Sequence, residues 1–418
     1  MGCTRSSVRE TTMRQADIRL AVPIMALVAA CIGASVHAAP PENGVYRVNI
    51  LDYGTKDDPV DRSGVADDSA ALAKAIDAVN ASTSVRKPAC VYIPAGTYRI
   101  VSAPPPFALA GCVKGDGSSQ TTLRIDPEFT GDLFAWSESW EPTKPGPTVV
   151  GLTVQGSAAA SAIQNAFVFY DRNDEVFMED VTVKNLHGRA LYSGVTKHVS
   201  QAYMRESHMT SLRFFNDGAP GVPVVEFNSV GSGQVDGTNE IRMSMVDIYG
   251  AVGPSFVIRN ASTGSVRNIT LEALRIEGLQ QTVFGPSQGD LLTIGDSVMT
   301  GIVNNIVLTD VELIDPGQGY CALRILEPSG HPAPYQITVR GSIGGGQPYG
   351  EGLCINAGRT STFDLTGIHT FGKNVVIGPG VSQIVLNGGG QEKSWTFDID
   401  PTSRRGISFP LLSQPFAQ

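Results

Sequence analysis

The sequence predicts an all-β fold, a right-handed parallel β-helix with three strands per coil and one N-terminal capping helix. A pattern of two short strands recurs along the chain at the spacing of one solenoid coil. A second pattern, a glycine followed by a third strand, recurs between its copies. The composition agrees, because 46 Gly and 26 Pro with only 7% aromatic residues are typical of many short strands joined by turns.

The first pattern places apolar residues around a two-residue corner, as in Val176-x-Met178-x-x-Val181-x-Val183. Close copies begin at Ile241, Ile269 and Ile306, a degenerate copy at Ala202, and shorter copies at Ile337, Phe363 and Ile384. The third strand follows Gly188, Gly253, Gly289, Gly319, Gly350 and Gly372. We therefore expect one β-helix domain over residues 45–393 and a C-terminal cap or tail over 394–418.

Residues 1–38 have the pattern of a signal peptide. Arg14 and Arg19 precede the apolar stretch 20–32, and Val36-His37-Ala38 has the small residues of a cleavage site. The apolar stretch is too short for a lasting transmembrane span. Residues 28–31, Val-Ala-Ala-Cys, also resemble a bacterial lipobox, in which Cys31 would carry a lipid anchor. We expect a secreted or periplasmic protein, or an outer-membrane lipoprotein if Cys31 is lipidated.

Four cysteines remain if cleavage follows Ala38, namely Cys90, Cys112, Cys321 and Cys354. An even number in an exported chain permits two disulfides, and the local pairings are Cys90 with Cys112 and Cys321 with Cys354. Four buried thiols are the alternative, because a free cysteine behaves as a small hydrophobic residue.

Residues 49–98 contain a strand, a helix and a strand pair. The segment 49–54, Asn-Ile-Leu-Asp-Tyr-Gly, is a strand pattern that closes on glycine. Asp67-Asp68-Ser69 supplies capping side chains, and the spacing of Leu72, Ile76 and Val79 predicts an amphipathic helix over 67–80. The segment 91–98, Val-Tyr-Ile-Pro-Ala-Gly-Thr-Tyr, is a strand, a Pro-Gly turn and a strand. In this order the motifs resemble the N-terminal signature of the pectate-lyase-like β-helix superfamily.

The resemblance implies that the helix covers the open end of the solenoid and that the substrate is a polysaccharide, above all an acidic one that contains uronate. Members of the superfamily include polygalacturonase-type hydrolases, uronan lyases, uronate epimerases and phage tailspikes. The catalytic phrases of the polygalacturonase-like members, such as Asp-Asp-Cys-Ile and Gly-His-Gly-Ile, are not present in this sequence. A polysaccharide lyase or hydrolase is the main expectation, and a uronate epimerase or a non-catalytic polysaccharide-binding or adhesin protein is the alternative.

Those members hold their catalytic acids just before the third strand. In this sequence the equivalent column of residues is Arg189, Pro223, Pro254, Asp290, Cys321, Glu351 and Lys373. Asp290 and Glu351 are two rows apart, roughly 9–10 Å, and their side chains could approach the ~6.5–9.5 Å that an inverting hydrolase requires. We therefore predict Asp290 and Glu351 as catalytic acids.

Arg324 lies on the row between these acids and is predicted to bind a sugar carboxylate while it keeps one acid ionised. Glu226, Arg259 and Tyr320 are predicted to extend the substrate-binding face. The alternative is that Asp290, Arg324 and Glu351 form a solvated charge ladder without a catalytic role.

A second face presents another column of charged residues. In the first strand pattern, the outward positions on consecutive rows hold Thr182, His208, Asp247, Arg275 and Glu312. A structural role is the favoured interpretation, because opposite charges on neighbouring strands stabilise a sheet by themselves.

Cofactors and other partners leave few marks on the sequence. The predicted chemistry requires no cofactor, and no His or Cys pattern has metal-ligand spacing. One acidic group is a candidate calcium site, although acids at this place also cap the helix: Asp57, Asp58, Asp61, Asp67 and Asp68. The net charge of −9 and the lack of a basic run argue against a nucleic-acid partner. The oligomeric state stays open.

Overall fold

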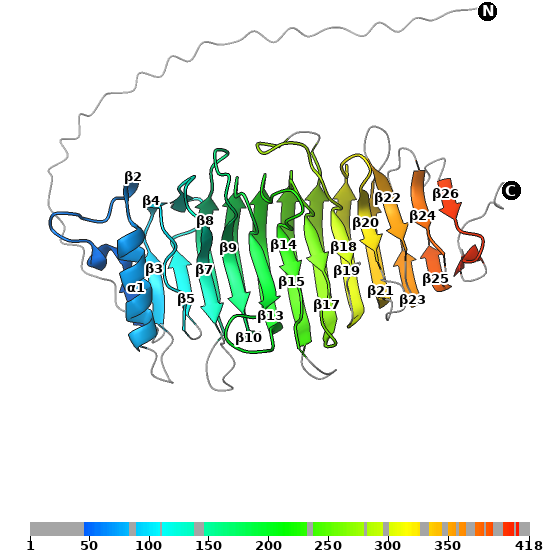
Figure 1. Cartoon of the computed structure of the whole chain (residues 1–418), viewed down its shortest axis with the longest axis horizontal. Coiled ribbons are helices and arrows are strands. Elements are labelled where there is room, and N and C mark those ends of the chain that lie inside the picture. The colour runs from blue at the N-terminus through cyan, green and yellow to red at the C-terminus, as the bar shows by residue number, and fades with distance from the viewer. Residues whose placement is uncertain are drawn as a thin grey trace, which may run out of the picture. The chain divides into compact units, whose positions relative to one another are not determined.

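The described part of the chain is a stack of parallel strand rows (Figure 1). The structure is a computed structural model and describes residues 46–82, 89–108, 111–137, 146–231, 237–279, 282–295, 301–326, 334–344, 350–356, 359–364, 373–379, 382–387, 396–404 and 407–408. These lie in one compact unit, residues 41–418. The predicted signal peptide and Cys31 lie outside the described residues. Among the residues that the structure describes, no helix is long and apolar enough to cross a membrane.

Two parallel sheets form the walls of the solenoid, in agreement with the predicted right-handed parallel β-helix. Sheet A contains β1 (Tyr46–Asn49), β2 (Ser63–Asp67), β3 (Ala89–Ile93), β4 (Gly96–Ile100), β5 (Cys112–Gly115), β6 (Thr121–Ile125), β8 (Thr148–Gln155), β10 (Arg172–Asp174), β11 (Phe177–Lys184), β13 (Tyr203–Phe215), β15 (Gly237–Tyr249), β17 (Ser265–Glu277), β19 (Ile302–Ile314), β21 (Tyr335–Ile343), β23 (Arg359–Asp364), β25 (Ser382–Asn387) and β27 (Ile407–Ser408).

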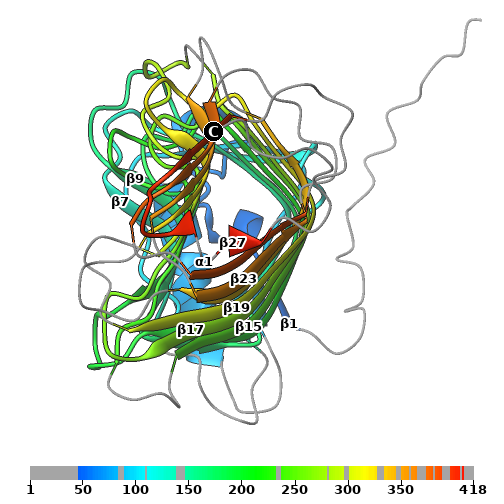
Figure 2. The same ribbon diagram turned by 90° about the vertical axis from the view of Figure 1, so that its right-hand side faces the viewer.

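Sheet B is the second wall and consists of one short strand from each coil. In spatial order it contains β7 (Gly131–Ser137), β9 (Gln164–Tyr170), β12 (Leu191–Val195), β14 (Val225–Phe227), β16 (Phe256–Ile258), β18 (Leu292–Ile294), β20 (Cys321–Ile325), β22 (Glu351–Ile355), β24 (Lys373–Ile377) and β26 (Thr396–Ile399). Figure 2, viewed from the right-hand side of Figure 1, shows how the two sheets enclose one interior.

The long strands of sheet A bend at two corners, and this bending wraps each coil around the core. In β15 the corners are Glu240 and Met245, which have positive φ values of 57° and 54°. The corners of neighbouring rows stack on one another because β13, β15, β17 and β19 pair in register. The repeated strand pattern of the sequence therefore describes one bent strand per coil, and the glycine-preceded pattern describes the strand of sheet B.

The interior of the solenoid is filled by the inward side chains of every row. In β15, Met243, Val246 and Ile248 are at most 2% exposed. Burying an aliphatic side chain of this size contributes about 1.5–3 kcal/mol. At the N-terminal end aromatic rings replace aliphatic ones, and the ring centroid of Trp136 lies 5.2 Å from Phe107 and 4.9 Å from Phe169. The core is thus one continuous column of stacked apolar side chains.

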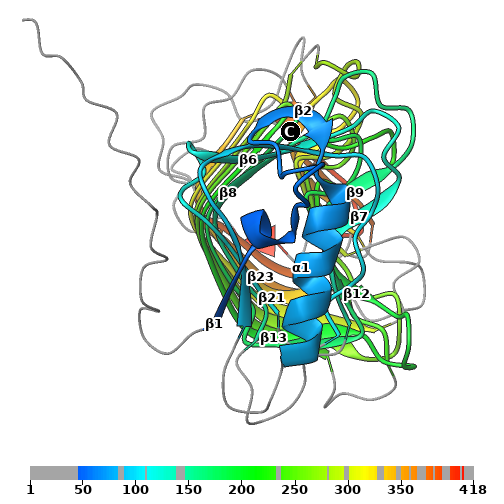
Figure 3. The same cartoon turned by 90° about the vertical axis from the view of Figure 1, so that its left-hand side faces the viewer.

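The α-helix α1 (Ser69–Ser82) covers the N-terminal end of this column, as Figure 3 shows. Its buried face contains Leu72, Ile76 and Val79, the residues whose spacing predicted a helix over 67–80. It packs against β3 and the short 3-10 helix η2 (Ile50–Tyr53). Without the helix, the apolar interior would meet water at this end.

The degenerate strand copy that we predicted to begin at Ala202 is five residues out of register. Met178 pairs with Met209 and Val181 with Leu212, so the matching copy begins at Ser207. The error has a local cause, because residues 202–204 continue the same alternation one segment earlier, where β13 pairs with β10. Arg213 therefore occupies the row position that was predicted for His208, beside Thr182 and Asp247.

Strand pairing continues into the segment predicted as a C-terminal cap or tail. β26 pairs with β24 and β27 pairs with β25, both in parallel. The solenoid rows therefore extend past residue 393 into that segment.

Candidate functional site

Charged side chains of alternating sign lie on the outward face of sheet B. On successive rows they are Arg189, Glu226, Arg259, Asp290, Arg324 and Glu351, and we call them the sheet B ladder. The register places Asp290 one row from Cys321 and two rows from Glu351, as the sequence predicts.

Glu226 is fully buried at the centre of the first half of this ladder. Its Oε2 atom lies 3.0 Å from Nε of Arg189, and its Oε1 atom lies 2.5 Å from a terminal nitrogen of Arg259. The guanidinium group of Arg189 also stacks over Tyr192, 4.4 Å from the ring centroid. Glu226 thus holds two arginines in place, and the substrate contact that we predicted for it stays a prediction.

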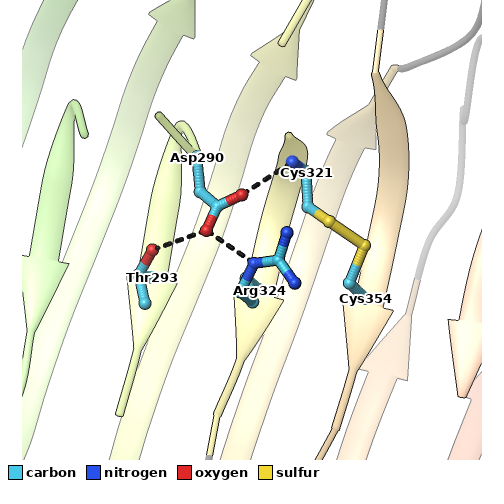
Figure 4. The surroundings of a disulfide bond; sticks show 5 residues. All are labelled: Asp290, Thr293, Cys321, Arg324 and Cys354. Carbon is cyan, nitrogen blue, oxygen red and sulfur yellow. Dashed lines mark hydrogen bonds and ion pairs between the residues drawn. A yellow bond between two sulfur atoms is a disulfide. The ribbon is translucent and has the colours of Figure 1, made fainter. Parts of the chain in front are cut away.

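Asp290 and Arg324 form the second ion pair, shown in Figure 4. Nε of Arg324 donates to Oδ2 of Asp290 at 2.6 Å, and the backbone N–H of Cys321 donates to Oδ1 at 2.7 Å. The side chains are 21% and 13% exposed. Both oxygens of Asp290 are therefore occupied, and the guanidinium group that we predicted to bind a sugar carboxylate is bound to a carboxylate of the protein.

Two disulfides join neighbouring rows. Cys321 of β20 is bonded to Cys354 of β22, beside the Asp290–Arg324 pair (Figure 4). Cys90 of β3 is bonded to Cys112 of β5, its direct partner in the register of sheet A. The predicted acid Glu351 is half-buried on β22, and its backbone N–H donates to the carbonyl of Tyr320 at 2.7 Å.

Two open cavities, of about 480 Å³ and about 580 Å³, lie on sheet A. They share His208, Arg242 and Thr270, so they form one groove across β11, β13, β15, β17 and β19. We call it the sheet A groove. Its lining residues are Glu175, Glu206, His208, Glu240, Arg242, Asn268, Thr270, Asn305 and Val307 in the first cavity, and Phe177, Met209, Thr210, Met243, Ser244 and Glu272 are added in the second.

Three glutamates form one edge of this groove. Glu175, Glu206 and Glu240 occupy the same corner on successive rows, with φ between 50° and 57°. All three are exposed, and none has an ion-pair partner within 4 Å in the part of the chain that the structure describes. Left-handed backbone costs a residue with a side chain roughly 1–2 kcal/mol, and Asn, Asp and Gly adopt it most readily. Glutamate at this corner on three rows is therefore doubly unfavourable, in backbone conformation and in charge.

The floor of the groove holds one column of outward side chains from consecutive rows. Phe177 pairs with His208, His208 with Arg242, and Arg242 with Thr270. Rows are separated by about 4.8 Å, so the imidazole of His208 and the guanidinium of Arg242 belong to adjacent rows within reach of one sugar unit. Phe177 is 37% exposed, and its ring offers an apolar surface at the end of the column.

Sequence reasoning missed this groove, although one signal was available. The register error at Ala202 moved His208 into the wrong column, which separated it from Arg242. With the copy placed at Ser207, Glu206 and Glu240 both fall directly before the first residue of the pattern, and His208 and Arg242 both fall directly after it.

The acids that we considered as a calcium site include two, Asp61 and Asp68, that accept hydrogen bonds in and beside the loop before α1. Ser63 donates to Asp61 through its hydroxyl at 2.8 Å and its backbone N–H at 2.9 Å, and Ala66 N and Val65 N donate to Oδ2 at 2.8 Å and 2.7 Å. These bonds hold the pKa of Asp61 well below the usual range. Burial raises the pKa of Asp68 to about 6. In the residues that the structure describes, no group of three His, Cys, Asp or Glu side chains is close enough to hold a metal ion.

One further acid lies away from both faces. Asp217 is 1% exposed, and its Oδ1 atom accepts a hydrogen bond from Leu186 N at 2.8 Å. Its Oδ2 atom is buried and has no hydrogen-bond partner among the described residues. Burial raises the pKa of Asp217 well above its usual range.

No curated protein sequence matches the chain. Among solved structures, ORF18 of Geobacillus virus E2 is 14% identical with a TM-score of 0.45, and the match covers 87% of this chain and 59% of the viral chain. The A-module of mannuronan C-5 epimerase AlgE4 from Azotobacter vinelandii is 15% identical with a TM-score of 0.40, covering 87% and 99%. The surface protein and adhesin PfbA of Streptococcus pneumoniae is 14% identical with a TM-score of 0.48, covering 87% and 99%.

A family match covers more than half of the chain. It extends over residues 47–309, from the first strand of sheet A to β19, and so includes α1, the sheet A groove and the larger part of the sheet B ladder. The chain belongs to the rhamnogalacturonase A/epimerase, pectate lyase-like family.

Proposed function

We propose that this chain is an exported polysaccharide hydrolase whose substrate lies along the sheet A groove. The observation that carries the proposal is the stack of three exposed glutamates, Glu175, Glu206 and Glu240, at the edge of a cavity of about 480 Å³. The bend itself belongs to the fold, since every long strand of sheet A turns at this corner, but three like charges on successive rows oppose the pairing of these strands. Such features persist where the surrounding structure holds them for a functional reason.

The spacing of these acids suits glycoside hydrolysis. Carboxylates on adjacent rows have backbones about 4.8 Å apart, and those two rows apart have backbones about 9.6 Å apart. Retaining hydrolases use carboxyl groups about 5–5.5 Å apart, and inverting ones about 6.5–9.5 Å apart. Glu206 is central, so it can act together with either neighbour. One carboxylic acid would protonate the leaving oxygen while the other carboxylate acts on the sugar or on water.

A second candidate reaction uses the floor of the groove. His208 and Arg242 lie on adjacent rows of one column. In a lyase or an epimerase, a cation neutralises the uronate carboxylate and a neighbouring base takes the proton beside it. The adjacency of His208 and Arg242 supports this reading, whereas the sequence-based site at Asp290, Glu351 and Arg324 has its arginine bound to Asp290.

The test separates these reactions and the two faces. The mature protein is incubated with pectate, alginate and bacterial exopolysaccharides, and reducing ends and the ultraviolet absorbance of unsaturated uronate are followed together. Reducing ends alone indicate a hydrolase, and a rise in both indicates a lyase. Glu206→Gln is expected to lower kcat by at least about 100-fold, the usual scale for loss of a catalytic acid or base.

Asp290→Asn is the companion variant on the sheet B ladder. Under our proposal it retains kcat within about threefold, provided that circular dichroism shows a folded protein. Loss of activity in Asp290→Asn but not in Glu206→Gln would move the site to the sheet B ladder. Polymer binding without any product from the whole panel would instead identify a non-catalytic binding protein or adhesin.

A further inference from the structure

The sheet A groove changes its chemistry from one end to the other. The corner column that begins with Glu175, Glu206 and Glu240 continues on the next rows with Asn268 and Asn305. Both asparagines line the same cavity of about 480 Å³. The groove is therefore bordered by carboxylates over β11, β13 and β15 and by amides over β17 and β19.

The amides form a hydrogen-bonded ladder. Nδ2 of Asn268 donates to Oδ1 of Asn239 at 2.7 Å, and Nδ2 of Asn305 donates to Oδ1 of Asn268 at 2.7 Å. Each bond runs in the same direction along the solenoid, so the ladder fixes the orientation of every amide group. We call Asn239, Asn268 and Asn305 the amide ladder.

A fixed ladder leaves each amide with defined capacity for a ligand. An asparagine amide has two N–H donors and two acceptor lone pairs, and the ladder uses one donor and one acceptor of Asn268. The remaining N–H can donate to the oxygen of one sugar hydroxyl. The remaining lone pair can accept a hydrogen bond from another sugar hydroxyl. An amide carries no charge that could pair with a uronate carboxylate. Arg242, the arginine among the lining residues, lies on β15, where glutamates border the groove.

We propose that the amide ladder is the specificity-determining part of the sheet A groove and binds the hydroxyl groups of uncharged sugar units. The polymer accepted by the groove is then uncharged over β17 and β19, and the reacting bond lies beside Glu206 and Glu240. This inference rests on the proposed function and assigns the sugar chemistry of one end of its site.

The experiment uses the full mature chain and named probes. Binding is measured by affinity electrophoresis with neutral arabinan, galactan and glucan and with polygalacturonate and alginate, at about 50 mM and about 500 mM NaCl. The wild-type protein is expected to bind at least one neutral polymer with an affinity that salt leaves unchanged, because no charged group of that ligand is screened.

The amide variants test the ladder itself. Asn305→Ala and Asn268→Ala are expected to raise Kd or KM for the neutral polymer about three- to tenfold, the loss of one or two hydrogen bonds, with kcat within about twofold. Asn304→Ala is the matched control, since Asn304 directly precedes Asn305 in β19 and is not among the residues that line the cavity. The control should bind like the wild-type protein.

The outcomes separate the inference from the proposed function. Equal affinity of Asn305→Ala and Asn304→Ala, in a protein whose activity still depends on Glu206, overturns the amide ladder alone. Binding that is confined to polygalacturonate or alginate and weakens with salt also overturns it. A protein that binds and cleaves none of the polymers overturns both proposals.

Discussion

Two sets of acidic side chains lie on different walls of the same solenoid, and they differ in their partners. On sheet B, Glu226 and Asp290 each meet an arginine of a neighbouring row. On sheet A, Glu175, Glu206 and Glu240 stack on one another in strained backbone without such a partner among the described residues. One arrangement neutralises charge within the fold, and the other leaves it to be used in a groove.

The difference shows what a parallel solenoid can do with one repeated unit. Every row places equivalent positions about 4.8 Å apart, so any side chain meets its counterpart on both sides. Alternating signs along a column stabilise the sheet, whereas equal signs destabilise it. A column of like charges therefore lowers the stability of the sheet. The column of glutamates on sheet A is of this kind.

Glutamate-to-glutamine substitutions on the two walls should show the largest difference in the free energy of unfolding. Glu226→Gln leaves Arg189 and Arg259 without their shared buried counter-charge, and removal of one partner of a buried ion pair typically costs about 3–5 kcal/mol. Glu206→Gln, the matched exposed variant, removes like-charge repulsion on both sides and should raise stability by less than about 1 kcal/mol. Urea unfolding followed by circular dichroism measures both values. Equal effects of the two variants would show that the sheet B ladder is not a structural device.

The two disulfides offer a similar comparison between walls. They close segments of similar length, with sequence separations of 22 and 33 residues. Loop-closure entropy alone predicts a loss of about 3–4 kcal/mol for each double Cys→Ser variant, and less than about 0.5 kcal/mol between them. Urea unfolding of the Cys90/Cys112 and Cys321/Cys354 double variants checks this. A much larger loss for the sheet B disulfide would mean that it also supports the adjacent Asp290–Arg324 pair.

Much of the fold could be predicted from the sequence because inward positions repeat with one period. The positions of Val176, Met178, Val181 and Val183 are apolar again in the buried row of β15. The row of β13 departs from this pattern at Ser207. The helix over Leu72, Ile76 and Val79 was equally visible, since its apolar stripe has helical spacing. These features depend on burial, which acts on residue type alone.

The site was harder to predict because it depends on register. Residues 202–214 repeat the same alternation twice, and hydrophobicity alone does not distinguish the two alignments. Pairing with β11 and β15 selects the copy that begins at Ser207, and this shift of five residues brings His208 beside Arg242. Glu226 illustrates a second difficulty, which is burial. The sequence does not show whether a glutamate is buried between two arginines or exposed to a substrate.

Asp217 is a third case, an acid that is buried with no cationic partner among the described residues. Its folded pKa lies above its unfolded value, so the proton that it binds in the folded state stabilises the protein at low pH. This stability is present below the unfolded pKa and is lost as pH rises through the folded pKa. Asp217→Asn keeps an uncharged side chain at every pH and should raise the free energy of unfolding by about 1–3 kcal/mol at neutral pH.

The pH profile of that variant supplies the control. Below about pH 4, near the usual pKa of an aspartic acid, Asp217→Asn and the wild-type protein should unfold at similar urea concentrations. Asp310→Asn is the matched exposed variant, because Asp310 occupies a left-handed corner of β19 that asparagine also adopts readily. A stability gain for Asp217→Asn that is independent of pH would contradict the assignment of a protonated buried acid.

Arg275 on sheet A should give the smallest effect, and its value decides whether pairing or burial stabilises charges in this fold. Arg275 pairs with Glu277 at 2.7 Å and with Glu312 at 3.3 Å, so it has two acidic partners, as Glu226 has two basic ones. Its side chain is 51% exposed, whereas Glu226 is fully buried. Exposed pairs contribute about 0–1 kcal/mol and are screened by salt, so Arg275→Ala should lose less than about 1 kcal/mol in urea unfolding and still less at high salt. A loss as large as that of Glu226→Gln would mean that the number of partners, rather than their removal from water, sets the strength of these ladders.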